Sequence, residues 1–462
     1  MRLDFMDFKK NINGKKVAVL GIGVSNRPLI KSIVNMGANV TACDKMFREE
    51  IGCICDEFED MGVILNLGPD YLDKLDNFDY IFRTPSLRPD LPQIEKAVKN
   101  GASLTSEMEE FLKYCPAEVI GVTGSDGKTT TTTLIYEMLK KEGYNVWVGG
   151  NIGTPLFDKL DVIKAEDKVV LELSSFQLMT MKISPDIAVV TNLSPNHLDM
   201  HKSMDEYIQS KKNIYKYQDA KGMLVLNKDN SITRDMEKEA KGNTVFFSIS
   251  KSLEKGAFLD GANLVLIENG NKKTICSTDE IKLPGIHNIE NLLAASAAIS
   301  SLCSIKSMRD VATNFMGVEH RIEFVREVNG VKYYNDSIAS SPSRAAAGLN
   351  AFKQRVILIA GGYDKKIPFD GLAIKGIDKI KLLILMGATA DKIENAFIEE
   401  MGKQNKRIPI IHAAGLKEAV EAARDKGEEG DIVTLSPACA SFDMFKNFEE
   451  RGNKFKEIVN NL

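Results

Sequence analysis

The chain has 462 residues, more than one hydrophobic core usually organises, and a typical size of about 150 residues per domain predicts three domains. Its hydrophobic content of 44% and charged content of 27% are ordinary for a globular protein, and a net charge of −4 gives no basic footprint for nucleic acid, so we expect small molecules as partners. The 7 cysteines show neither zinc spacing nor a disulfide pattern, and no signal peptide or apolar run of about 20 residues is present, which predicts a cytoplasmic protein without a membrane span.

Short apolar segments alternate with helical ones through most of the chain, which is typical of α/β proteins with parallel sheets. A first series of strands is expected at residues 16–20, 40–43, 63–65 and 80–82. A helical segment at 107–114 and a strand at 118–120 lead to a second series at 146–148, 169–173, 187–192 and 223–227. Residues 241–285 indicate a small antiparallel excursion before an alanine-rich helix at 291–302. A third series follows at 331–334, 356–360, 382–386 and 432–435, so we place the domains at 1–105, 106–317 and 318–462.

The first strand leads into a glycine turn, Gly21-Ile22-Gly23-Val24-Ser25-Asn26, and Asp44 ends the next strand. This is a partial dinucleotide fingerprint, because Asn26 stands at the third glycine position. The turn either connects strand and helix without a ligand or holds the diphosphate of a nucleotide-linked substrate. A nucleotide site further along the chain favours the second interpretation over a dehydrogenase. The candidate substrate-binding residues of this region are Gly23, Ser25, Asp44, Thr84 and Ser86.

Residues 121–133 read GVTGSDGKTTTTT and lie where an apolar strand passes into a helix. Glycines there let backbone amides approach a polyphosphate at the positive end of the helix, where Lys128 can meet the β- and γ-phosphates and the Thr129 hydroxyl can bind Mg²⁺. Val122 occupies the first glycine position of the standard phosphate loop, and a solvated turn is the alternative. We predict an ATP site formed by Gly124, Ser125, Asp126, Gly127, Lys128, Thr129 and Thr130.

Several further segments, together with this loop, resemble the Mur ligase family of peptidoglycan synthesis. They are residues 149–153, 171–177, 191–199 and 319–321. The segments 334–337 and 435–452 are most similar to the members that add D-glutamate to UDP-N-acetylmuramoyl-L-alanine. The resemblance extends over all three expected domains.

The resemblance implies a Rossmann-like N-terminal domain that binds the UDP-substrate. It also implies a central P-loop ATPase-type domain and a Rossmann-like C-terminal domain that binds the amino acid. The implied reaction uses ATP and Mg²⁺ to activate a carboxylate as an acyl phosphate, which the amine of D-glutamate then attacks. We expect a monomer.

The resemblance assigns the catalytic residues Lys128, Glu172, His197 and Lys211, and the metal ligands Thr129, Glu172, His197 and Lys211. Glu172 ends an expected buried strand, where a carboxylate is costly without a cation, although it could instead cap the next helix. His197 is the expected ligand of a second Mg²⁺; a histidine on a surface loop is the alternative. Lys211 matches a lysine that CO₂ carbamylates into a carboxylate-like group, and only the family register selects it over Lys212.

Further roles follow from the same resemblance. Arg321 is suited to bridge phosphate oxygens, and Asn288, Asn291 and Asp336 match positions around adenine and ribose, although the asparagines could also be helix caps. The remaining substrate-binding candidates are Asn151, Ser340, Lys365, Ser441 and Phe448, with Lys366 as a rival to Lys365. The chain departs from the family at Asp126, Ile338 and Ser340, where asparagine, lysine and threonine are common.

Two other functions compete with this prediction. Another amino-acid-adding Mur ligase or an enzyme similar to folylpolyglutamate synthetase would share the chemistry. A non-catalytic nucleotide-binding regulator would not need the combination of Lys128, Glu172, His197 and Arg321.

Overall fold

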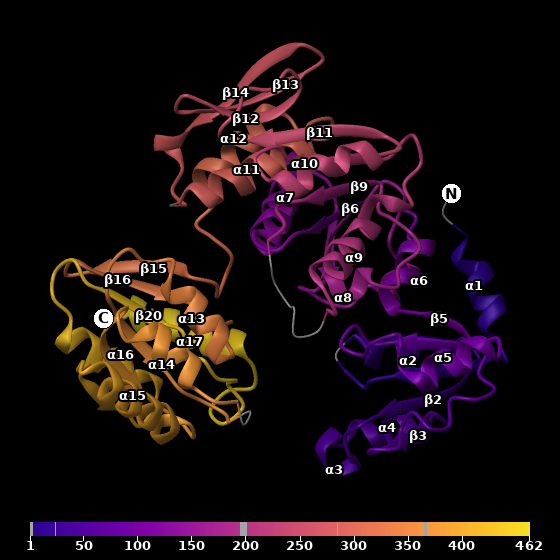
Figure 1. Cartoon of the computed structure of the whole chain (residues 1–462), viewed down its shortest axis with the longest axis horizontal. Coiled ribbons are helices and arrows are strands. Elements are labelled where there is room, and N and C mark those ends of the chain that lie inside the picture. The colour runs from indigo at the N-terminus through magenta and orange to yellow at the C-terminus, as the bar shows by residue number, and fades with distance from the viewer. Residues whose placement is uncertain (1–2, 24, 195–200, 284, 365–366) are drawn as a thin grey trace. The chain divides into compact units, whose positions relative to one another are not determined.

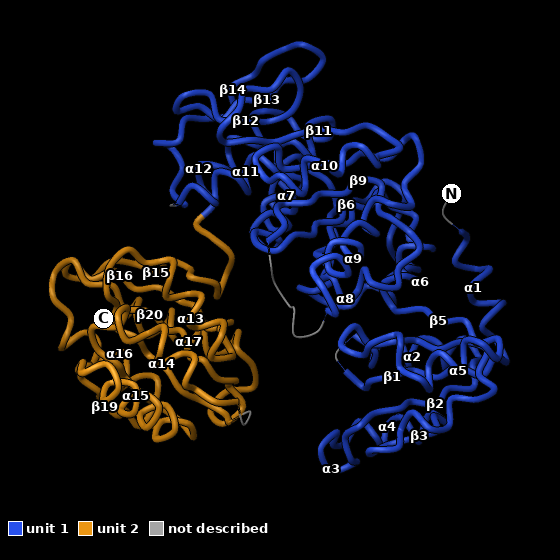
Figure 2. Tube along the Cα trace, in the orientation of Figure 1, with its two compact units in different colours: residues 1–315 blue, residues 316–462 orange. Residues whose placement is uncertain are grey.

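The computed structural model describes residues 3–23, 25–194, 201–283, 285–364 and 367–462. The chain forms two compact units, residues 1–315 and 316–462 (Figure 2). Unit 1 contains two sheets and unit 2 contains one. In the part of the chain that is described, no helix combines the length and the apolar character needed to cross a membrane.

The first sheet of unit 1 is parallel, with the strand order β3-β2-β1-β4-β5 (Figure 1). Its strands are β1 (Lys16–Leu20), β2 (Asn39–Asp44), β3 (Ile64–Leu67), β4 (Tyr80–Arg83) and β5 (Ser103–Thr105). The accompanying helices are α1 (Phe5–Ile12), α2 (Asn26–Asn35), α3 (Arg48–Ile51), α4 (Ile54–Asp60) and α5 (Pro92–Lys99). From β1 the chain adds β2 and β3 on one side of the sheet and then β4 and β5 on the other. At such a switch point, the carboxyl ends of the two neighbouring strands, here β1 and β4, form a crevice that commonly binds ligands.

The second sheet has the strand order β14-β13-β12-β11-β10-β9-β6-β8-β7. Its strands are β6 (Glu118–Thr123), β7 (Val146–Gly150), β8 (Lys168–Glu172), β9 (Ile187–Val190), β10 (Met223–Asn227), β11 (Asn243–Ser248), β12 (Gly256–Asp260), β13 (Asn263–Glu268) and β14 (Asn271–Ser277). Its helices are α6 (Glu107–Tyr114), α7 (Lys128–Glu142), α8 (Ser175–Leu178), α9 (Met204–Lys216), α10 (Ser231–Asp235), α11 (Ile286–Ala298) and α12 (Ile305–Asn314). Among the described strands of this sheet, β6 to β12 pair with one another in parallel. The pairs β12–β13 and β13–β14 are antiparallel.

Unit 2 has the strand order β15-β16-β20-β17-β18-β19, in which only β15 is antiparallel to its neighbour. The strands are β15 (Glu323–Val328), β16 (Val331–Asn335), β17 (Val356–Ala360), β18 (Ile380–Leu385), β19 (Ile410–His412) and β20 (Ile432–Leu435). The helices are α13 (Pro342–Leu349), α14 (Asp370–Gly376), α15 (Ala390–Gln404), α16 (Leu416–Lys426) and α17 (Phe448–Asn460).

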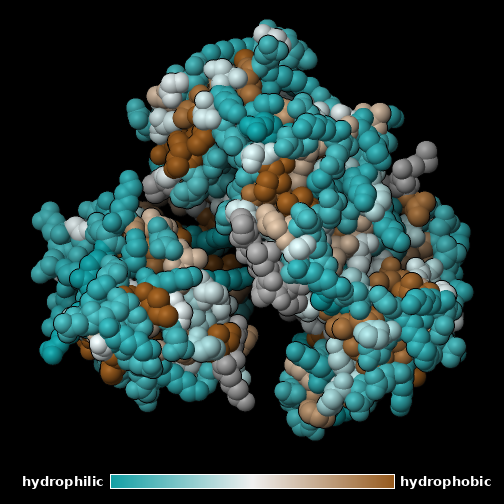
Figure 3. Space-filling view, viewed as in Figure 1, coloured by the Kyte–Doolittle hydropathy of each residue, from teal (hydrophilic) through white to brown (hydrophobic). Residues whose placement is uncertain are grey.

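The two sheets of unit 1 share one apolar core. A single cluster of buried side chains includes Val17 and Phe82 of the first sheet together with Val119 and Leu171 of the second. On the face drawn in Figure 3, hydrophilic side chains predominate and the hydrophobic ones form small groups, as expected when most large apolar residues are inside. The shared core is the physical reason why residues 1–315 cluster as one unit.

The structure confirms the α/β class with three mostly parallel sheets. The expected antiparallel excursion is smaller than residues 241–285, because β11 and β12 extend the parallel part of the sheet and only the hairpins from β12 to β14 reverse direction. The boundary between the two compact units lies at 315/316. A separate domain at residues 1–105 stays a prediction.

Candidate active site

The phosphate loop connects β6 to α7, and its shape requires glycine at two positions. Gly124 has φ +154° and Gly127 has φ +79°, so both adopt backbone conformations that side chains rarely tolerate. A Cβ at Gly124 would lie 1.9 Å from the Oγ1 of Thr191, and one at Gly127 would lie 2.3 Å from the Oδ1 of Asn291. The loop therefore packs directly against the chain that follows β9 and against α11.

Hydrogen bonds hold this loop in place. The amide of Ser125 donates to the carbonyl of Asn192 at 2.8 Å, and the amide of Asp126 donates to the Asn192 Oδ1 at 3.0 Å. The Ser125 hydroxyl lies 2.9 Å from the hydroxyl of Tyr207 on α9. Thr129 and Thr130 lie in the first turn of α7, where backbone amides lack partners within the helix. The arrangement is preorganised for an anion at the start of α7.

Two lysines converge on the loop. The Nζ of Lys128 donates to the carbonyls of Gly124 at 3.0 Å and Ser125 at 2.9 Å. The Nζ of Lys211, on α9, donates to the Gly124 carbonyl at 2.8 Å and to the Oγ1 of Thr123 at 3.1 Å. Burial, and next the charge of Lys128, hold the pKa of Lys211 well below its usual range. Lys212 instead pairs with a glutamate elsewhere on unit 1, Glu239, at 2.5 Å.

Glu172 stands at the end of β8 and is 1% exposed. Its Oε1 accepts a hydrogen bond of 2.7 Å from the Nδ2 of Asn151, whereas its Oε2 has no hydrogen-bond partner among the residues described. The helix after it is capped by Ser174, whose hydroxyl accepts from the amide of Gln177. Glu172 is therefore not the cap of α8, and its buried oxygen suits a bound cation.

The expected adenine and ribose residues on α11 are both buried. The Nδ2 of Asn291 donates to the Oδ1 of Asn288 at 3.3 Å, and the Oδ1 of Asn291 accepts from the hydroxyl of Thr131 on α7 at 3.3 Å. Gly285 is the N-cap of α11, and neither asparagine occupies that position. The structure thus places Asn291 against the phosphate loop, while its contact with a nucleoside stays a prediction.

A cavity of about 370 Å³ lies in unit 1 beside Glu172's partner, Asn151. It brings together three of the predicted substrate-binding residues, Ser25, Ser86 and Asn151, with five residues that were not named as individual site candidates. These are Pro85, Gly150, Ser174, Phe176 and Gln177. The sequence signal for the last three was their position in the segment 171–177, which supported the family resemblance but in which only Glu172 was assigned a role.

The other first-sheet candidates shape the turn beneath this cavity. The two carboxylate oxygens of Asp44 accept hydrogen bonds from the amides of Ile22 at 2.7 Å and Met46 at 3.0 Å. The Gly23 carbonyl accepts from the first turn of α2, and a Cβ on Gly21 would lie 3.0 Å from the side chain of Thr84. Asp44 is thus engaged with its own turn, and its contact with a ribose stays a prediction.

In unit 2, Arg321 stands between two residues with left-handed backbone, His320 at φ +62° and Ile322 at φ +47°. Such a conformation is rare for a β-branched residue and marks a constrained segment. Asp336 accepts hydrogen bonds from the Ile322 amide at 3.3 Å and from the Ser436 hydroxyl at 2.7 Å. Burial raises the pKa of Asp336 to about 7, against the lowering effects of the Ser436 hydrogen bond and the charge of Arg321.

The amino-acid candidates of unit 2 lie on three segments. Ser340 borders a small recess together with Cys439, and Ser441 is buried in the loop after β20. Phe448 begins α17, and its ring packs edge-on against His320 at 5.9 Å. Lys365 and His197 lie outside the described residues, as does Lys366.

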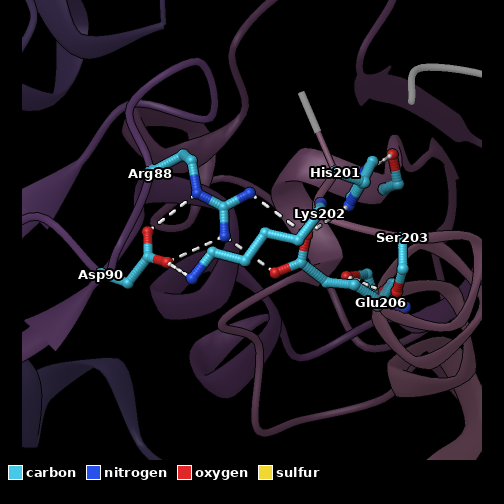
Figure 4. A network of polar contacts seen from close by, with 8 residues as sticks. Arg88, Asp90, His201, Lys202, Ser203 and Glu206 are labelled. Carbon is cyan, nitrogen blue, oxygen red and sulfur yellow. Dashed lines mark hydrogen bonds and ion pairs between the residues drawn. The ribbon is translucent and has the colours of Figure 1, made fainter. Parts of the chain in front are cut away.

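The sequence missed a polar network that connects the loop after β4 to α9 (Figure 4). The guanidinium of Arg88 binds Asp90 and Glu206, and Lys202 binds Asp90 as well. His201, to which no role was assigned, is 3% exposed, and its Nε2 lies 2.9 Å from the Ser175 hydroxyl. Its ring stacks on Phe176 at 5.2 Å. In the sequence His201 follows His197 by four residues, a spacing that indicated no zinc site without a third ligand, so no role was predicted for it.

The chain is similar to known proteins over most of its length. The family model described as Mur ligase middle domain matches residues 122–299, and the one described as Mur ligase, glutamate ligase domain matches residues 320–439. The UDP-N-acetylmuramoylalanine--D-glutamate ligases of Clostridium botulinum (strain 657 / Type Ba4) and Clostridium novyi (strain NT) are 60% and 59% identical to the chain, over the full length of both proteins.

Solved structures show the same fold at much lower identity. UDP-N-acetylmuramate-alanine ligase from Thermotoga maritima has a TM-score of 0.55 at 18% identity, covering 97% of this chain and 99% of its own. A murein peptide ligase from Psychrobacter arcticus has a TM-score of 0.52 at 18% identity, with the same coverage.

Proposed function

The chain belongs to the Mur ligase family, and we propose that the site around its phosphate loop carries out that family's ligation chemistry with the residues described above. The protein is an ATP-dependent ligase that adds D-glutamate to UDP-N-acetylmuramoyl-L-alanine in peptidoglycan synthesis. The observation that carries the assignment of the site is the convergence of Lys128 and Lys211 on one loop, together with the buried Glu172, whose charge acts on Lys211.

The reaction joins a carboxylate to an amine. The carboxylate oxygen of the alanyl group first attacks the γ-phosphorus of ATP, the bond to the β-phosphate oxygen breaks, and ADP leaves. The amine of D-glutamate then attacks the carbonyl of the resulting acyl phosphate, loses a proton, and expels inorganic phosphate from the tetrahedral intermediate. The phosphoryl step depends on positioning and on neutralising charge more than on covalent help from the protein.

Lys128 is suited to the γ-phosphate. Its ammonium group lies against the carbonyls of Gly124 and Ser125, at the point where the amides of α7 begin. A triphosphate there would exchange those neutral acceptors for charged ones, which bind an ammonium group more strongly. Gly127 lets the backbone come close to the phosphates, and Asp126 adds a negative charge at the exposed rim of the loop.

Magnesium fits the donor set of the site. The buried Oε2 of Glu172 lacks a hydrogen-bond partner within the described ranges, and Thr129 is a hydroxyl donor in the first turn of α7. We assign the metal ligands to Glu172, Thr129, a carbamylated Lys211 and His197, the last of which lies outside the described residues. The ion would neutralise charge on the phosphoryl group during its transfer.

Lys211 meets the chemical requirements for carbamylation. CO₂ reacts with an unprotonated amine, and burial lowers the pKa of this lysine, so its free-amine form is accessible at a lower pH than in an exposed lysine. A carbamate would replace a buried cation by an anion close to Glu172, and a cation between the two would offset their repulsion. The match of Lys211 to the family's modified lysine supports the same assignment.

We assign the cavity of about 370 Å³ to the UDP-linked substrate. Ser25 and Ser86 come from the crevice of the first sheet, and Asn151 leads from the cavity to Glu172. The reacting carboxylate would thus lie towards the phosphate loop. Gly23, Asp44 and Thr84 support the turn under this cavity.

In unit 2 we assign Arg321 to phosphate oxygens and Asp336 to the nucleoside. Ser340, Ser441, Phe448 and Lys365 are assigned to D-glutamate, of which Lys365 lies outside the described residues. We further propose that the enzyme is a cytoplasmic monomer with domains at 1–105, 106–317 and 318–462.

One assay tests the proposed function. Phosphate release is measured with a panel of UDP-muramoyl acceptors crossed with a panel of amino acids. We expect turnover only with UDP-N-acetylmuramoyl-L-alanine and D-glutamate together with ATP and Mg²⁺. Preference for another amino acid or a folate acceptor would replace the substrate assignment, and ATP binding without substrate-stimulated release would indicate a regulator.

A further inference from the structure

Arg83 is buried at the end of β4, at a distance from the phosphate loop's chemistry. It is 1% exposed, and within the described residues it forms no ion pair with a carboxylate. Burial lowers its pKa to about 10, so the guanidinium stays charged at neutral pH. The charge of the buried Glu109 acts against this lowering of the pKa and offsets part of the cost of burying the cation, and the hydrogen bonds of the guanidinium offset more.

Those hydrogen bonds reach two different segments. The Nη1 atom donates to the carbonyls of Thr84 at 3.2 Å, Pro85 at 3.1 Å and Leu87 at 2.5 Å. The Nη2 atom donates to the carbonyl of Phe176 at 2.8 Å and to the hydroxyl of Thr180 at 3.1 Å. The first set lies on the loop after β4, and the second lies on and just after α8.

The same two segments both contribute to the wall of the cavity assigned to the UDP-substrate. Pro85 and Ser86 come from the loop after β4, while Ser174, Phe176 and Gln177 come from the region of α8. We propose that Arg83 is a positioning residue that fixes these two walls at the separation that the UDP-linked substrate requires. The identity of that ligand rests on the proposed function.

Arginine suits this task for a geometric reason. Its guanidinium presents five donors in one rigid plane, so it can bind carbonyls from two chain segments at once. Lysine carries its three donor hydrogens on a single nitrogen atom at the end of a flexible side chain, so it cannot hold both segments in the same geometry. Within the loop that it binds, the amides of Thr84 and Leu87 donate to the carbonyls of Leu20 and Thr84, and Arg83 adds donors for the carbonyls of Thr84, Pro85 and Leu87.

A second arginine touches the same loop from a different side. Arg88 joins it to Glu206 on α9, and this pair is about a quarter exposed (Figure 4). Arg88 holds the loop to α9 by two hydrogen bonds to Glu206, whereas Arg83 holds it to the segment of α8 that lines the cavity, so we expect Arg83 to dominate the separation of the cavity walls. The two arginines can be separated experimentally because Arg83 bonds to Phe176 and Thr180, and Arg88 bonds to Glu206.

The test compares Arg83→Met and Arg83→Lys with a matched control, Ile94→Ala. Ile94 is fully buried on α5 in an apolar cluster against which Leu87 of the same loop packs, so its truncation lowers stability beside the loop while leaving the hydrogen bonds of Arg83 in place. For Arg83→Met we expect the KM for the UDP-substrate to rise at least tenfold while the KM for ATP changes less than twofold. Arg83→Lys should fall between wild type and Arg83→Met, and Ile94→Ala should change neither KM.

Hydrogen–deuterium exchange provides a readout that does not depend on the substrate. In Arg83→Met, peptides covering residues 84–87 and 175–181 should exchange faster, and β1 should stay protected. Unchanged exchange in either segment, or faster exchange with an unaltered KM for the UDP-substrate, would overturn the assignment. If the wild-type protein turned over no UDP-muramoyl substrate at all, the proposed function would fail, while the exchange data would still decide whether Arg83 holds the two walls.

Discussion

Replacing Lys211 by alanine tests the chemistry of the site most directly. The Nζ of Lys211 lies 2.8 Å from the Gly124 carbonyl and 3.1 Å from the Thr123 hydroxyl, and its side chain is buried. If the lysine acts as a carbamate, the variant loses a carboxylate-like group close to Glu172. If it acts as an ammonium group, the variant loses a cation beside the phosphates. The two cases differ in which small molecule restores activity.

The expected loss follows from the position of the group. Removing one preorganised electrostatic group beside the reacting atoms typically lowers kcat by about 10²- to 10³-fold. The truncation also leaves space for a small ion, because formate and acetate are smaller than the side chain removed. We expect either carboxylate to restore part of the lost activity, and ammonium or methylamine to restore none.

The assay is phosphate release at saturating substrates, titrated with formate, acetate or methylamine. Lys212→Ala is the matched control, because Lys212 neighbours Lys211 in sequence but pairs with Glu239 instead of contacting the loop. The control should retain activity within about twofold, as expected for the loss of a largely surface-type ion pair. Rescue of Lys211→Ala by methylamine and not by carboxylates would refute the carbamate, and rescue confined to Lys212→Ala would show that the family register is wrong.

Three further results are expected. Gly127→Ala should lower kcat/KM for ATP by at least about 10²-fold, because its Cβ would lie 2.3 Å from Asn291 and displace the loop; normal ATP kinetics would contradict the assigned geometry. Lys128→Ala should abolish ATP turnover and leave calorimetric binding of the UDP-substrate intact, and a comparable loss of that binding would contradict the separation of the two sites. Burial raises the pKa of Glu107 to about 7. Because the folded protein holds this proton more tightly than the unfolded chain, the shift contributes up to about 3 kcal/mol to the free energy of unfolding. The contribution is complete below about pH 4 and is lost as the pH rises to 7. Glu107→Gln should remove that decline in urea unfolding followed by the single tryptophan, Trp147, and an unchanged pH dependence would refute it.

The strands were largely predictable because those of a parallel sheet are buried on both faces and read as apolar runs. β1 and β10 have the predicted bounds. The prediction missed β5 and β19, which have only three residues each, and β15, whose sequence EFVREV carries three charges on an edge strand. Short or edge strands bury too little to leave a clear pattern in the sequence.

The phosphate loop was predictable because its function depends on neighbours in sequence. A glycine turn, a lysine and a hydroxyl have to follow one another at the start of a helix. The contact of Glu172 with Asn151 was not predictable, although both residues had been singled out. It arises because β7 and β8 pair in parallel and place Gly150 beside Glu172, so that Asn151 follows at the same edge. The motifs identified the two residues, but only the pairing of β7 with β8 in the structure shows that Asn151 and Glu172 are in contact.

Two buried arginines that hold loops in place, Arg83 and Arg451, were also not identified from the sequence. Arg451 on α17 is fully buried and donates to the Ser337 hydroxyl at 3.0 Å and to the carbonyls of Ser337, Cys439 and Ala440. Arg83 binds three carbonyls of a loop in unit 1 in the same way. The loop after β4 and the loop after β20 both carry candidate substrate residues, and neither forms a strand that pairs with the sheet.

A guanidinium group can supply such a loop with several donors from one rigid side chain, whereas every residue type offers the carbonyl acceptors. The acceptors therefore leave no trace in the sequence. What indicates a loop held by an arginine is an arginine in an apolar segment, such as Arg83 at the end of the strand YIFR. Arg83 stands at the end of an apolar strand and is therefore recognisable in the sequence, whereas Arg451 lies in a charged helix and leaves no such signal, although both hold a loop in the same way.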